Sequence, residues 1–112
     1  MKTLDKPFKR GYNQIKIESC TFNENVTYNV TIVSENYLDI KIVAIDNNNV
    51  VSSDTDINIQ NWYNEISFRK EYSINIMNSN CDIYVCFHAR SNGFLPIEDS
   101  NYNNSTNNIS LF

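Results

Sequence analysis

Residues 26–33 alternate between apolar and polar side chains as far as Ile32. The segment reads Val-Thr-Tyr-Asn-Val-Thr-Ile-Val, so Val26, Tyr28, Val30 and Ile32 fall on one face. A period of two is the repeat of a β-strand that buries one face. Apolar residues recur nowhere at helical spacing over several turns, so the chain must build its core from strands.

The same alternation recurs in short segments along the whole chain. The other predicted strands cover residues 14–18, 37–45, 50–51, 57–59, 66–68, 72–76 and 82–89. In the last segment Ile83 and Phe87 share one face, whereas Cys86 and His88 share the other. Seven or eight strands at near-regular spacing are typical of a sandwich or a barrel. We therefore expect an all-β fold, a two-sheet antiparallel β-sandwich of jelly-roll or immunoglobulin-like type.

The length of 112 residues fits one domain with one hydrophobic core. We expect a single domain over 1–112, with a flexible N-terminal arm over 1–12 and a loop-rich C-terminal segment over 91–112. That last segment contains Gly93, Pro96 and a stretch rich in Asn, Ser and Thr. The turn residues at 46–49 and 78–80 are expected to separate neighbouring strands.

Charge and hydropathy limit the partners. The net charge is −4 and the nine Lys and Arg residues form no stripe, so we expect no nucleic-acid partner. No stretch approaches the roughly 20 apolar residues of a membrane helix, so we expect a soluble chain without membrane insertion. The compartment stays open: secreted or lumenal if a signal peptide has been removed, otherwise cytoplasmic. The oligomeric state is also open.

The 20 asparagines and 14 isoleucines are the unusual feature of the composition. An AT-rich genome enriches both residue types, and the asparagines are dispersed among apolar residues. Five glycosylation sequons begin at Asn25, Asn29, Asn103, Asn104 and Asn108, a small excess over chance. They permit a secreted setting without requiring one.

Catalytic and metal motifs are weak. Cys86 and His88 stand two residues apart on one strand face, but no third orienting group or glycine-lined oxyanion site lies nearby. The three cysteines and one histidine match no standard zinc spacing. With two glycines in all, a tight phosphate cradle is not expected. We therefore expect no enzyme activity and no cofactor.

Acidic residues near turns are weak calcium candidates. Asp46 ends one predicted strand, and Asp54 and Asp56 form an Asp-x-Asp step in an expected loop. Calcium takes several oxygen ligands from neighbouring loops. The alternative is that Asp occupies turns for backbone reasons.

Trp62 and Tyr63 are the candidate ligand-binding residues. They lie between predicted strands among polar neighbours. An exposed Trp-Tyr pair can stack on a sugar ring or anchor a protein interface. The alternative is that Trp62 caps the core.

Three short motifs resemble the GOLD domain of Golgi cargo receptors. They read Cys-Thr-Phe at 20–22, Tyr-Leu-Asp-Ile at 37–40 and Asp-Ile-Tyr-Val-Cys-Phe at 82–87. The resemblance covers about residues 18–90. It implies a disulfide between Cys20 and Cys86, with Cys81 free. The chain departs from the family pattern in the length between Leu38 and Cys86 and in lacking the usual glycine before the last strand.

The sequence thus predicts a non-catalytic binding or interaction module that recognises a protein or glycan partner through surface loops. The first alternative is a lumenal trafficking domain of GOLD type. The second is a small enzyme that uses Cys86 and His88.

Overall fold

The computed structural model describes residues 3–34, 37–46, 49–56, 68–104 and 108–110. In these residues all regular structure is β-strand, and every strand pair is antiparallel. The strands are β1 (Thr3–Phe8), β2 (Gly11–Thr21), β3 (Val26–Ser34), β4 (Tyr37–Asp46), β5 (Asn49–Asp56), β6 (Phe68–Ile76), β7 (Asn80–Ala89), β8 (Gly93–Asn103) and β9 (Asn108–Ser110). This part of the chain contains no helix long and apolar enough to cross a lipid bilayer.

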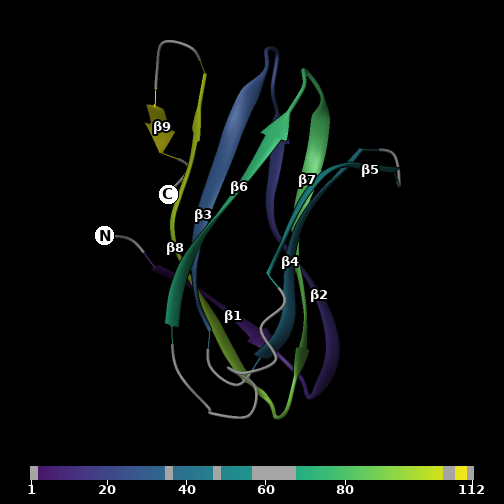
Figure 1. Ribbon diagram of the computed structural model, residues 1–112, viewed down its shortest axis with the longest axis vertical. Coiled ribbons are helices and arrows are strands. Elements are labelled where there is room, and N and C mark those ends of the chain that lie inside the picture. The colour runs from purple at the N-terminus through teal and green to yellow at the C-terminus, as the bar shows by residue number, and fades with distance from the viewer. Residues whose placement is uncertain (1–2, 35–36, 47–48, 57–67, 105–107, 111–112) are drawn as a thin grey trace.

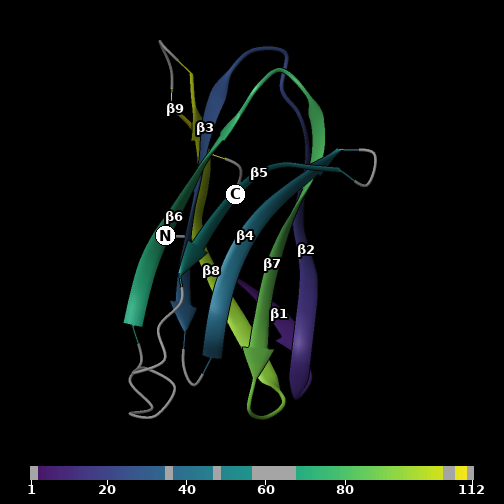
Figure 2. The ribbon, with the colours of Figure 1, turned by 45° about the vertical axis from the view of Figure 1, so that its right-hand side comes forward.

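The strands form two sheets, as Figures 1 and 2 show. The five-stranded sheet has the order β1-β8-β3-β6, with β9 also paired to β8, and the four-stranded sheet has the order β2-β7-β4-β5. Four of the pairs, β1 with β8, β2 with β7, β3 with β6 and β4 with β5, are those of one long hairpin folded at the β4–β5 turn. The predicted all-β fold with two antiparallel sheets is confirmed.

Alternate residues of both sheets fill the core between them. The four inward residues predicted for β3 are buried, with Tyr28 and Val30 fully so. The same holds in β7, where Ile83 and Phe87 are inaccessible to solvent and His88 is exposed. Residues with a period of two therefore pack against the facing sheet, as the sequence predicts.

One aromatic pair connects the two sheets, and a second connects the segment after β2 to β8. Phe8 of β1 meets Phe87 of β7 edge to face, with ring centroids 5.2 Å apart, and Phe22 meets Tyr102 of β8 at 4.9 Å. Gly93 lies opposite Phe8 in the β1–β8 ladder. A Cβ at this glycine would come within 2.8 Å of Phe8 Cζ, so the ring packs where only glycine leaves room.

The outer face of the five-stranded sheet is a network of amides and hydroxyls. Asn29 Nδ2 donates to Asn101 Oδ1 at 3.1 Å, and Ser73 Oγ donates to Asn29 Oδ1 at 2.6 Å. One step along, Thr27 Oγ1 donates to Asn75 Oδ1 at 3.0 Å. Short polar side chains thus bond directly across neighbouring strands.

The two ends of the chain differ from the prediction. Residues 3–8, expected within a flexible arm, form β1, and residues 93–103, expected within a loop-rich segment, form β8. Each ladder position from 3 to 8 pairs with one from 98 to 93. Proline lacks a backbone N–H and therefore argues against a strand when a segment is read alone. Pro7 and Pro96 are accommodated here because β1 and β8 pair with each other along their length.

The predicted turns are found. Asp46 and Asn49 are the last paired residues of the β4–β5 hairpin. Between β6 and β7, Asn78 adopts φ 35°, a left-handed angle that asparagine tolerates better than most residues.

The core packing predicts a large difference between two Phe→Ala variants. Phe87→Ala removes a fully buried ring and is expected to lower the free energy of unfolding by about 3–5 kcal/mol. Phe94, which is 67% exposed, is the matched control, and Phe94→Ala should change it by no more than about 0.5 kcal/mol. Urea denaturation followed by far-ultraviolet circular dichroism measures both. Equal losses in the two variants would contradict this core.

Candidate functional site

The outer face of the four-stranded sheet carries a groove of about 590 Å³. We call it the sheet groove. It is lined by residues of four strands: Tyr12 and Gln14 of β2, Asp82, Tyr84 and Cys86 of β7, Lys41, Val43 and Ile45 of β4, and Val50 of β5. The register explains this set, because Gln14, Cys86 and Lys41 form one row across the sheet, and Tyr84 and Val43 lie in the next.

The floor of the sheet groove is apolar and buried. Val43 is 4% exposed and Cys86 is 6% exposed, yet neither belongs to the hydrophobic cluster between the sheets. Their positions in β4 and β7 put them on the opposite face from the core residues Ile42 and Val85. The groove therefore has a small hydrophobic floor of its own.

Tyr12 is the aromatic wall of the groove. Its side chain is 57% exposed and its ring lies 4.9 Å from the ring of His88, tilted by 46°. Gln14 Nε2 donates to the Tyr12 hydroxyl at 3.5 Å, at the outer limit of a hydrogen bond. Val50, on the β5 side, is 58% exposed.

Charged groups stand at the two ends of the groove. Lys41 lies beside Cys86 in the β4–β7 ladder, and Asp82 lies four residues further toward the start of β7, opposite Ile45. Asp82 Oδ1 accepts a hydrogen bond of 2.7 Å from Ser19 Oγ, which holds this carboxylate against β2. The groove thus offers a cationic donor, an anionic acceptor and an amide around an apolar floor.

The prediction that Cys86 and His88 share one strand face is confirmed, since both lie on the outer face of β7. Burial raises the pKa of the Cys86 thiol, and the opposing effects of the Tyr12 hydroxyl and Lys41 do not cancel this rise. The ring of His88 lies against Tyr12. A buried thiol with a raised pKa therefore lies close to an exposed tyrosine.

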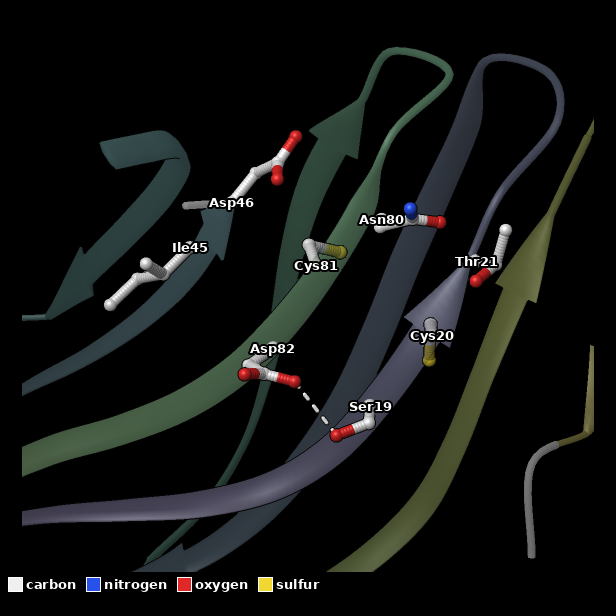
Figure 3. A pocket seen from close by; sticks show the side chains of 8 residues that line it. All are labelled: Ser19, Cys20, Thr21, Ile45, Asp46, Asn80, Cys81 and Asp82. Atoms are coloured by element: carbon white, nitrogen blue, oxygen red, sulfur yellow. Dashed lines mark hydrogen bonds between the residues drawn. The ribbon is translucent and has the colours of Figure 1, made fainter. Parts of the chain in front are cut away.

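A second, smaller hollow of about 320 Å³ lies where β2 ends and β7 begins, and Figure 3 shows its lining. Cys20 and Cys81 face one another there as direct partners in the β2–β7 ladder. Burial raises the pKa of the Cys20 thiol to about 12, and the charge of Glu18 adds to the rise. Burial, with Asp82 as the next cause, raises the pKa of the Cys81 thiol to about 11.

The disulfide between Cys20 and Cys86 that the GOLD resemblance implies is wrong for this fold. Cys86 lies opposite Gln14, six residues from Cys20 along β2. Six residues of a strand span about 20 Å, well beyond the reach of a disulfide. All three cysteines are free.

The calcium candidates do not share a loop. Asp54 and Asp56 lie within β5, opposite Ile42 and Ile40, rather than in the loop that the sequence predicts. Asp46 is at the far end of the same hairpin, opposite Asn49. In the described part of the chain, no three His, Cys, Asp or Glu side chains gather around a point where they could hold a metal ion.

Trp62 and Tyr63, the predicted ligand-binding residues, lie outside the described residues. The sequence does not predict the sheet groove, because its aromatic wall is Tyr12, which lies in the expected N-terminal arm over 1–12. The signal in the sequence is the alternation at 14–18. Tyr12 lies two residues before Gln14, so it falls on the same polar face of the strand.

No family model matches this chain, and no curated protein and no solved structure is detectably similar to it.

The raised thiol pKa values predict how alkylation depends on pH. Because the thiolate is the reactive form, the rate at which iodoacetamide modifies Cys20 and Cys81 should rise about tenfold per pH unit from pH 7 to 9, without a plateau. Mass spectrometry of the labelled peptides gives the rates. Glu18→Gln should speed the labelling of Cys20, because it removes a nearby negative charge. A plateau near pH 8.5, the usual thiol value, would contradict this environment.

Proposed function

We propose that this protein is a non-catalytic binding module that recognises a glycan through the sheet groove. One observation carries the proposal. The exposed ring of Tyr12 lines the same groove as the apolar floor, together with side chains that donate and side chains that accept hydrogen bonds. The groove volume of about 590 Å³ falls in the range of ligand sites.

The chemistry of a sugar fits this arrangement. A pyranose ring has apolar C–H faces and a rim of hydroxyls, so it needs an aromatic or aliphatic surface together with donors and acceptors. Asp82 accepts hydrogen bonds, Lys41 donates them, and Gln14 does both. An entirely apolar ligand would remove water from Lys41 and Asp82 without replacing it, which is unfavourable.

The strand order supports a finer description of the fold, and we propose that it is a jelly roll. The pairs β1–β8, β2–β7, β3–β6 and β4–β5 belong to one rolled hairpin divided between two sheets. Lectins are among the proteins with this architecture. Because folds of this kind serve many functions, the argument for glycan binding rests on the groove.

A non-catalytic role agrees with the state of Cys86. Its thiol is buried and its pKa is raised, whereas a nucleophilic cysteine needs a lowered pKa. A small Cys/His enzyme is therefore the weaker alternative.

Recognition of a protein is the second candidate, and a different observation favours it. Phe94, at the start of β8, is 67% exposed and borders an apolar hollow of about 480 Å³ together with Pro7, Phe8 and Lys9. Exposed aromatic side chains beside a hollow are typical of interface anchors.

The proposed function predicts that the full chain is retained on a glycan array and that Tyr12→Ala weakens binding to the retained glycan at least about tenfold, or about 1.4 kcal/mol. The loss follows from removal of the aromatic wall. Isothermal titration calorimetry measures the affinity, and circular dichroism checks that the variant keeps the fold. Asp82→Asn should also weaken binding, because the amide no longer accepts with both terminal atoms.

Phe94→Ala is the matched control, since it removes an aromatic ring of similar exposure that lies away from the groove. Unchanged affinity in Phe94→Ala with a loss in Tyr12→Ala supports the sheet groove. Absence of retention of the parent chain on every glycan would contradict glycan recognition. Equal affinity of Tyr12→Ala and the parent chain would contradict this site.

A further inference from the structure

Cys20 and Cys81 are direct cross-strand partners. They occupy one ladder position of β2 and β7, and their side chains lie on the core side, where Cys81 is 5% exposed and Cys20 packs against the same cluster. Opposite residues in antiparallel strands have Cα atoms about 4.5 or 5.5 Å apart, according to the type of pair. Both distances fall within the range of about 4.4–6.8 Å that a disulfide spans.

A bulge in β2 is what brings the two cysteines together. From Gly11 to Lys16 the ladder is in one register, with Lys16 opposite Tyr84, and it shifts by one residue between Lys16 and Glu18. Without that shift Cys20 would lie opposite Asn80. The extra residue thus aligns the thiols on neighbouring strands.

The ladder is fixed on both sides of the pair. On one side Ser19 Oγ donates to Asp82 Oδ1 at 2.7 Å, and on the other the amide of Phe22 donates to the carbonyl of Ser79 at 3.0 Å. These bonds hold the backbone of both cysteines in register. Figure 3 shows the two thiols on adjacent strands beside the hollow that they line.

We propose that Cys20 and Cys81 form a cross-strand disulfide, which closes by reaction with a low-molecular-weight disulfide such as oxidised glutathione while the chain folds. In the folding chain the thiolate of Cys20, which is not yet buried, attacks one glutathione sulfur and releases one glutathione thiolate. The thiolate of Cys81 then attacks the Cys20 sulfur of the mixed disulfide and releases the second glutathione. Two protein thiols are oxidised, one glutathione disulfide is reduced, and the two thiol protons pass to the released glutathione.

The bond would join the edge strand β2 to the central strand β7. It would close a loop from residue 20 to residue 81, which contains β3, β4, β5 and β6. A crosslink across a loop of this length restricts the unfolded chain and so stabilises the fold. The proposal is independent of glycan binding, since neither cysteine lines the sheet groove.

The test uses the full chain refolded from urea in a glutathione redox buffer, so that both thiols react before they are buried. The expected product has one disulfide and one free thiol, at Cys86. Cys81 and Cys86 share a tryptic peptide, since no Lys or Arg lies between Lys70 and Arg90. A second cleavage after Tyr84 separates them, and mass spectrometry then identifies the linked peptides.

Three matched variants complete the test. In Cys86→Ser the oxidised protein should keep the disulfide and melt on the order of 10 °C higher than its reduced form. In Cys20→Ser and Cys81→Ser oxidation should give no such rise. A bond to Cys86, a glutathione that stays attached to Cys20, or three free thiols after refolding would each overturn the proposal.

Discussion

The two-sided burial of β7 is the constraint on which the rest of the structure depends. This strand pairs with β2 on one side and β4 on the other, so its backbone groups are satisfied by both neighbours. Its inward residues, among them Ile83, Val85 and Phe87, supply the core, and its outward residues supply the middle of the sheet groove. A slip of one residue would exchange these two sets, so the core and the groove fix the same register.

The period of two in β3 and β7 made the fold class and the core faces predictable from the sequence. The ends of the chain were not predictable in the same way, because β1 and β8 contain prolines and β8 turns polar after Ile97. Ser100 is fully buried there because its hydroxyl shares a hydrogen bond of 2.8 Å with Tyr28. The burial of such a polar residue cannot be recognised from the sequence, because its hydrogen-bond partner is 72 residues away.

The candidate site was less predictable than the fold, since it depends on which strands are neighbours. Tyr12 and Lys41 are far apart in the sequence and reach one groove only because β7 lies between their strands. The cysteines depend on a still finer detail. The implied partner of Cys20 was Cys86, but the strand pairing and a one-residue bulge place Cys81 opposite it. Bulges leave no reliable mark in a single sequence, because the extra residue can be of almost any type.

The two outer faces of the sandwich explain why the groove, rather than the Asn-rich sheet, is the candidate binding surface. On the five-stranded sheet Asn29 donates to Asn101 and accepts from Ser73, so this amide is already occupied by neighbouring strands and is 8% exposed. On the four-stranded sheet the Gln14 amide has a long bond of 3.5 Å to an exposed tyrosine. A ligand gains less free energy from a donor or acceptor whose good hydrogen bond within the protein must first be broken. The same residue chemistry is therefore structural on one face and available for recognition on the other.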